Sequence, residues 1–154
     1  IHEREVEANV LQPGILANGT LVQRLSRATT QSELSELAIA ATSVETLVND
    51  LFLRFLGRTP EPAEADSFIA ALTPSFGSRI LPEEEVIWPV PAERLPRVTW
   101  FNHGRPQANT IQLEMERRAA QGPPPHPQLR ASWREAYEDV VWSLINTSEF
   151  IWIP

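Results

Sequence analysis

The clearest pattern in the chain is a helical repeat of apolar residues between 44 and 56. Apolar side chains recur there at spacings of three and four, which places them on one face of an α-helix. They are Val44, Leu47, Val48, Leu51, Phe52, Phe55 and Leu56. Gly57 follows, in the position where a left-handed residue commonly ends a helix. The pattern predicts an amphipathic helix that stops at Gly57.

A second helix is expected directly after this one. Thr59 and Pro60 have the order of a cap followed by a proline in the first turn, where no backbone N–H is needed. The expected buried face consists of Ala65, Phe68, Ile69 and Leu72. Because the intervening turn is short, the two helices should form an antiparallel hairpin.

Four further regions have weaker helical patterns. Residues 10–25 have suitable spacings, but a Pro-Gly break and an Asn-Gly break predict two short helices there. Residues 29–41, 107–121 and 132–145 each predict one helix, and Gly122 is expected to end the third of these four regions. Three helix starts are assigned from capping-box spacings. These are Thr30 with Glu33, Thr42 with Glu45, and Ser132 with Glu135.

Proline-rich segments separate the helical patterns. Residues 73–106 contain too many prolines for regular structure and too many aromatics for simple disorder. We expect a long ordered excursion that lies across the helices, and a polyproline-II spacer at 122–128. Since no segment alternates with period two, no sheet is expected. The prediction is an all-α fold: one small helical bundle over residues 1–154, with this irregular excursion and an aromatic C-terminal tail.

Composition narrows the possible chemistry. The net charge of -7 argues against nucleic acid as the main partner. The chain has no cysteine, which excludes disulfides, thiolate metal sites and covalent haem attachment within it. It also has no lysine, which excludes a Schiff base and a Walker-type phosphate loop. No apolar run reaches the roughly 20 residues that a membrane helix requires. A start at Ile1 suggests a processed product or a piece of a longer chain.

Three stretches resemble a known family in the same order. They are "ANVLQPGILANGTLV", "LVNDLFLRFLGRTPEPAEADSFIAAL" and "AYEDVVWSLINTSEFIWIP". Each resembles part of the C-terminal domain of unknown function in planctomycete-type proteins that carry cytochrome-c-like domains upstream. The matching residues are Gln12, Asn18, Leu53, Gly57, Arg58, Pro60, Glu64, Trp142, Leu144, Asn146, Ser148, Glu149 and Phe150. The chain departs from the family pattern at Pro13 and Gly14, and residues 73–108 fit less clearly.

The resemblance implies a C-terminal module of a larger exported protein, in a periplasmic or extracellular setting. The haem-binding portion would lie elsewhere, because this chain has no cysteine. No cofactor is therefore expected in this chain. The family supplies no established catalytic residue, so none is assigned here.

His103 is the histidine with the most suggestive surroundings. It lies in the stretch "TWFNHGRP", close to Trp100, Phe101, Asn102 and Arg105. Such a group of aromatic and polar side chains could bind a sugar or a carboxylate. In the competing interpretation, the aromatics anchor the excursion to the bundle, while Asn102 and His103 satisfy the backbone of a turn.

The other titratable groups predict no catalytic or metal site. His126 lies inside the proline spacer and is expected to face solvent. Glu135 and Asp139 share a helix face, but a helix surface offers no cleft that would hold an acid and a base apart.

The chain ends on large apolar residues, although chain ends are usually polar and frayed. Phe150 and Trp152 are expected to fold back into the bundle, or else to dock on another protein. The leading functional hypothesis is a non-catalytic structural or interaction module. Its contacts would be a protein partner or upstream domains of the same polypeptide, with Trp88, Trp100, Phe101 and Trp152 as anchors. The alternatives are a carbohydrate-binding module and one wall of an active site completed by upstream domains.

Overall fold

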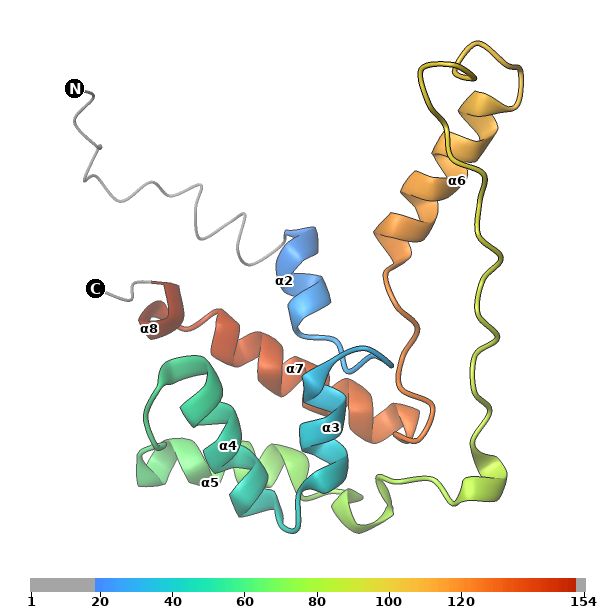
Figure 1. Cartoon of the computed structure of the whole chain (residues 1–154). Coiled ribbons are helices and arrows are strands. Elements are labelled where there is room, and N and C mark those ends of the chain that lie inside the picture. The colour runs from blue at the N-terminus through green and yellow to red at the C-terminus, as the bar shows by residue number, and fades with distance from the viewer. Residues whose placement is uncertain (1–18, 152–154) are drawn as a thin grey trace, which may run out of the picture.

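In the computed structural model, which describes residues 19–151, helices pack around α7 (Ala131–Ile145) (Figure 1). Against it lie α2 (Thr20–Leu25), α4 (Val44–Leu56), α5 (Pro62–Leu72) and the short α8 (Ser148–Ile151). The remaining α-helices of this range are α3 (Glu33–Ala40) and α6 (Ala108–Gln121). Residues 19–151 contain no β-strand, only isolated bridges between Thr29 and Pro125 and between Ile80 and Leu129. The predicted all-α fold is confirmed.

The core is built from the apolar faces that the periodicity identified. The side chain of Trp133 is buried and stacks on Tyr137 with ring centroids 5.2 Å apart. The two polar atoms of these rings are satisfied, because Trp133 Nε1 donates to Leu72 O and the Tyr137 hydroxyl donates to Leu34 O. Other buried core residues include Val22, Leu47, Val48, Leu51, Phe52, Val141, Leu144 and Ile145.

The hairpin of α4 and α5 forms as expected, but the second helix starts later. Gly57 has a φ of 69°, so it ends α4 in the left-handed region, where a side chain would be strained. Glu61 rather than Thr59 caps α5, in a reciprocal capping box with Glu64. Pro62 then occupies the first turn, the place predicted for Pro60.

The capping residues predicted for the other helices are wrong by one or two positions. Ser32 caps α3 by accepting from Leu34 N, and Ser43 caps α4 by accepting from Thr46 N. The start of α7 has no side-chain cap in the structure. The N–H of Arg130, the residue just before the helix, donates to Arg79 O. Neighbouring serines and threonines offer equivalent local spacings, so tertiary contacts decide among them.

A buried arginine joins the start of the excursion to the bundle. Arg79 has only 7% of its surface exposed, and its guanidinium donates to Ala38 O at 2.8 Å and Ala41 O at 2.6 Å. It also lies 3.8 Å from the centre of the Phe76 ring. Because the last carbonyls of a helix lack partners within the helix, Arg79 completes the C-terminal end of α3.

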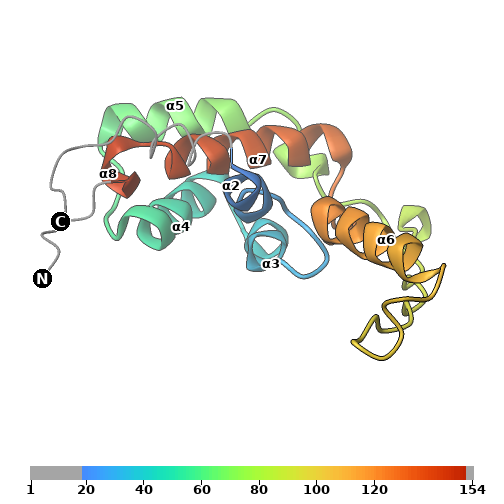
Figure 2. The ribbon, with the colours of Figure 1, turned by 90° about the horizontal axis from the view of Figure 1, so that it is seen from above.

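The excursion is irregular, as predicted, but it does not lie across the helices. Two short 3₁₀ turns, η1 (Phe76–Ser78) and η2 (Glu83–Glu85), cover the first part. From there the chain runs away from the bundle, turns at its far end, and returns as α6 (Figures 1 and 2). We call residues 86–121 the arm. Within α6 only Ala108 is buried, so this helix has almost no share in the core.

The proline spacer is tied into the structure on both sides. Thr30 N donates to Pro124 O and His126 N donates to Ala28 O, while Leu81 N donates to Gln128 O. His126 is therefore half-buried, which corrects the expectation that it faces solvent. Its ring lies edge-on to Trp88, with ring centroids 5.5 Å apart. Prolines lack an N–H, so the spacer is held through the carbonyls of Pro124 and Gln128, which accept, and through the N–H of His126, which donates.

The C-terminal end folds back against the hairpin at Phe150. Its ring lies 6.3 Å from the ring of Phe55, centroid to centroid, and packs against the core. The turn before it is fixed by Thr147, whose hydroxyl accepts from Phe150 N. Trp152, the other aromatic residue expected here, lies outside the described residues.

Candidate functional site

The arm carries a concentration of exposed apolar side chains. Trp100 has 81% of its surface exposed and Phe101 has 96%. Further exposed apolar residues of the arm are Ile87, Trp88, Val90, Leu113 and Met115. Single exposed apolar residues are ordinary, whereas several on one projecting element suggest an interaction surface.

The far end of the arm is a turn closed by its own side chains. Asn102 Oδ1 accepts from Thr99 N at 2.6 Å, and Asn102 Nδ2 donates to Arg97 O at 2.9 Å. His103 Nδ1 contacts Trp100 O, and the N–H of Arg105 donates to Asn102 O. Asn102 and His103 therefore satisfy turn backbone, as one of the two interpretations predicted.

The other half of that interpretation is wrong. Trp100 and Phe101 do not anchor the excursion to the bundle, because the turn lies at the end of the arm away from it (Figure 1). Within the part of the chain that the structure describes, the Trp100 ring stacks on His103 alone, with ring centroids 4.8 Å apart and planes 26° from parallel. The proline-rich segment runs away from the bundle. Because it has no periodic pattern of apolar residues, the sequence does not indicate this direction.

The base of the arm forms a broad groove of about 1050 Å³. Trp88 and Val90 line one side, Ala120 at the end of α6 lines another, and the prolines of the spacer form the third. Trp88 is 57% exposed even though its edge contacts His126. Burial lowers the pKa of His126, while the charge of Glu36 opposes that shift. The His126 ring is therefore favoured in its neutral form beside this groove.

Ion pairs stiffen the arm along α6. Glu114 accepts from Arg117 Nε at 2.7 Å and from Arg118 Nε at 2.8 Å, and these two cations hold its pKa at about 2. Arg118 also donates to Glu93 O at 2.6 Å, which fastens the irregular outward segment to the returning helix. Glu114 and Arg118 are four residues apart on α6, a spacing at which opposite charges can pair on a helix. The outward segment and the returning helix of the arm are therefore bonded to each other.

The predicted site residues separate into three places. The turn brings together Trp100, Phe101, Asn102, His103 and Arg105, while Trp88 lies at the base of the arm and Phe150 belongs to the bundle. Sequence reasoning missed Leu113 and Met115 of α6. The sequence did contain an indication. The apolar stripe of 107–121 is thin, and a helix with so little apolar surface can lie outside the core.

The titratable side chains of the described residues form no metal-holding cluster. No cluster of three or more His, Asp or Glu side chains within residues 19–151 is placed to hold a metal ion. In the same range, every helix is too short or too polar to cross a bilayer. Glu135 and Asp139 are exposed on the surface of α7.

Comparison of the chain with protein-family models, with curated proteins and with solved structures finds no match.

Proposed function

We propose that this chain is a non-catalytic interaction module that docks a protein surface through its arm. The observation that carries the proposal is the exposure of Trp100 and Phe101 at the end of an internally bonded projection. Tryptophan and other aromatic residues dominate the energy of protein interfaces, because they bury a large apolar area at a small cost in side-chain entropy. The groove beside Trp88 extends the same surface toward the bundle.

The polar groups of the turn favour protein docking over carbohydrate binding. A sugar site needs an exposed aromatic face together with free hydrogen-bonding groups around it. Here both amide atoms of Asn102 already bond to Thr99 and Arg97, and His103 Nδ1 contacts Trp100 O. The aromatic rings are exposed, but these neighbouring polar atoms are engaged within the turn.

The partner that we propose is another domain of a longer polypeptide or a separate subunit of an exported assembly. Its setting, and an association with a c-type cytochrome, follow from the resemblance of the hairpin and tail sequences to planctomycete-type proteins. The docking proposal itself rests on the arm and does not require that family assignment.

The test is the native mass of the protein taken gently from its source cells, compared with that of arm variants. The double variant Trp100→Ala/Phe101→Ala should move the protein from a larger assembly to the mass of a monomer. Leu53→Ala is the matched control, since Leu53 is an exposed apolar residue of α4 outside the arm. An assembly that tolerates the double variant and Trp88→Ala would contradict the proposal. A wild-type protein that is a lone species of 17.3 kDa in its source cells would contradict it as well, because that mass leaves no room for a partner domain or subunit.

A further inference from the structure

A second cavity, separate from the exposed end of the arm, opens on the bundle between α2, the start of α3 and the end of α4. Its volume is about 420 Å³, within the usual range for small-molecule sites. Leu34 and Ile145, both buried in the core, form part of its wall. Phe55 and Phe150 line it as well, so the folded-back C-terminal end helps to build the pocket.

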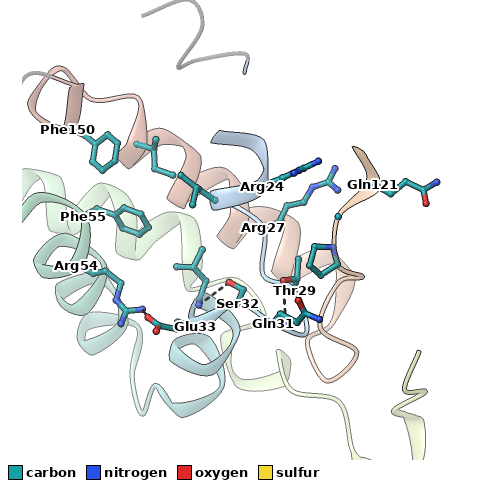
Figure 3. A pocket seen from close by; sticks show the side chains of 15 residues that line it. Arg24, Arg27, Thr29, Gln31, Ser32, Glu33, Arg54, Phe55, Gln121 and Phe150 are labelled. Carbon is teal, nitrogen blue, oxygen red and sulfur yellow. Dashed lines mark hydrogen bonds and ion pairs between the residues drawn. The ribbon is translucent and has the colours of Figure 1, made fainter. Parts of the chain in front are cut away.

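The two ends of this pocket differ in chemistry. Phe55 and Phe150 lie at one end, whereas Arg24 and Arg27 lie next to each other at the opposite end (Figure 3). The pocket is therefore elongated and amphipathic: an apolar wall leads to a pair of guanidinium groups. Pockets of this kind bind ligands through apolar contact and use a few polar groups to fix the orientation.

The charges around the pocket leave a local excess of positive charge. The carboxylate of Glu33 pairs with Arg54 at 2.7 Å, so these two lining residues neutralise one another. Arg24 donates through Nη2 to a backbone carbonyl, Ala119 O, and within residues 19–151 no carboxylate pairs with it. For the Arg27 guanidinium, no hydrogen bond and no ion pair is found within residues 19–151, although its charge helps to lower the pKa of Glu138. In a chain with a net charge of -7, this pair is a local exception.

We propose that this pocket binds a fatty acid. The carboxylate would lie against Arg24 and Arg27, and the hydrocarbon chain would follow the apolar wall toward Phe55 and Phe150. Arginine suits the charged end because its planar guanidinium donates two parallel hydrogen bonds to a carboxylate. The apolar end contributes through the burial of methylene groups, each of which is worth about 0.8 kcal/mol.

Isothermal titration of the full chain with dodecanoate, below its micelle concentration, tests this proposal. We expect one saturable site per chain. Dodecanol, which has the same chain without the charge, should bind about tenfold more weakly or worse, because it loses a charge-assisted hydrogen bond. Added salt should weaken binding of dodecanoate more than binding of dodecanol, because salt screens only the charged contact.

Two pocket variants and one control make the assignment specific. Arg24→Gln/Arg27→Gln should weaken dodecanoate binding about tenfold or more. Leu25→Glu adds a carboxylate to the pocket lining and should abolish binding; it keeps the test decisive if the double variant fails to fold. Arg94→Gln/Arg97→Gln removes two exposed arm arginines and should leave the affinity unchanged. No saturable binding to the wild type, or equal losses in pocket and control variants, would overturn the proposal. A stoichiometry of one ligand per two chains would mean that a second copy of the chain occupies or closes the pocket. That result would overturn the proposal too.

Discussion

Arg58 and Glu149 are 91 residues apart in the chain and form two hydrogen bonds of 2.8 Å with each other. The same guanidinium makes two further bonds to Glu64, at 2.8 and 2.9 Å. Arg58 follows the glycine that ends α4, Glu64 lies in the first turn of α5, and Glu149 lies in α8. One arginine thus joins both helices of the hairpin to the C-terminal end. We call these three residues the Arg58 network.

Arg58→Met should loosen the C-terminal end while leaving the hairpin formed. Methionine keeps much of the apolar length but removes the four bonds to Glu64 and Glu149, so two carboxylates are left close together without their cation. We expect a lower Tm and faster hydrogen exchange at the backbone N–H of Phe150, which donates to Thr147 in the fold. The control is Arg54→Met, which removes a single exposed pair with Glu33 and should have little effect. Equal behaviour of the two variants would contradict a role for the network in holding the tail.

The network should also make the fold sensitive to acid. The Arg58 guanidinium and the N–H of Glu61 hold the pKa of Glu64 at about 2, and Arg58 lowers the pKa of Glu149 as well. A carboxylate whose folded-state pKa is lowered stabilises the fold above its ordinary pKa, and that stability is lost as the pH falls through the folded value. The Tm should therefore fall as the pH drops from 4.5 toward about 2. Glu64→Gln should have a flatter Tm profile in this window. An unchanged slope would show that other carboxylates dominate.

Arg79→Met should destabilise the protein strongly and leave the internal bonds of the arm unchanged. The substitution removes the donors to the carbonyls of Ala38 and Ala41 in a buried place, where unsatisfied acceptors cost about 1–3 kcal/mol each. We expect the free energy of unfolding in urea to fall by about 2–4 kcal/mol. Arg130→Gln is the matched control, because Arg130 Nε makes one exposed bond to Ser78 O. A loss no larger than that of the control would mean that water replaces the guanidinium.

The sequence pattern predicts the bundle well, because burial imposes a helical period on it. The repeat at 44–56 and the apolar face of 132–145 identify α4 and α7, and Gly57 and Gly122 mark helix ends correctly. The capping residues are predicted less well. Several serines and threonines near each start satisfy the same local rule, and long-range pairing chooses among them, as at Arg130.

The candidate site is harder to predict, because its features are not periodic. An arginine is normally exposed, so nothing in the local sequence marks Arg79 as the buried partner of α3. The direction of the arm depends on bonds such as Arg118 to Glu93 O, which join residues far apart in the chain. The stretch "TWFNHGRP" is recognisable as a turn with aromatics, but whether those aromatics face the bundle or solvent depends on where the arm projects.

Trp100→Ala should change the stability of the fold little, whereas Trp133→Ala should lower it strongly. Trp100 is exposed, so its loss should change the free energy of unfolding by no more than about 0.5 kcal/mol. Trp133 is buried and bonded to Leu72 O, so its loss should cost about 3–5 kcal/mol. Chemical denaturation followed by circular dichroism measures both values. An unfolded Trp100→Ala variant would refute the exposed position of the turn and with it the docking proposal.

Glu138→Gln should stabilise the protein at neutral pH. The Glu138 carboxylate is half-buried: it accepts from Ala28 N at 3.0 Å and lies 3.4 Å from Arg134 Nε. Burial raises its pKa above the ordinary value of 4.5, against the lowering effects of the Ala28 bond and of the charges on Arg134 and Arg27. A carboxyl whose folded-state pKa is raised contributes stability below its ordinary pKa and loses it as the pH rises through the folded value. At pH 7 the ionised group therefore carries a net cost.

The amide that Glu138→Gln introduces would still accept from Ala28 N but would carry no charge to desolvate. The Tm of Glu138→Gln should therefore exceed that of the wild type at pH 7, and the difference should shrink toward pH 4, where Glu138 of the wild type becomes protonated. Glu135→Gln, which changes an exposed carboxylate one turn earlier, should show no such convergence. A lower Tm for Glu138→Gln at pH 7 would mean that attraction to Arg134 and Arg27 outweighs the cost of burial. Glu138 would then act as a stabilising charge between α7 and the segment before α3.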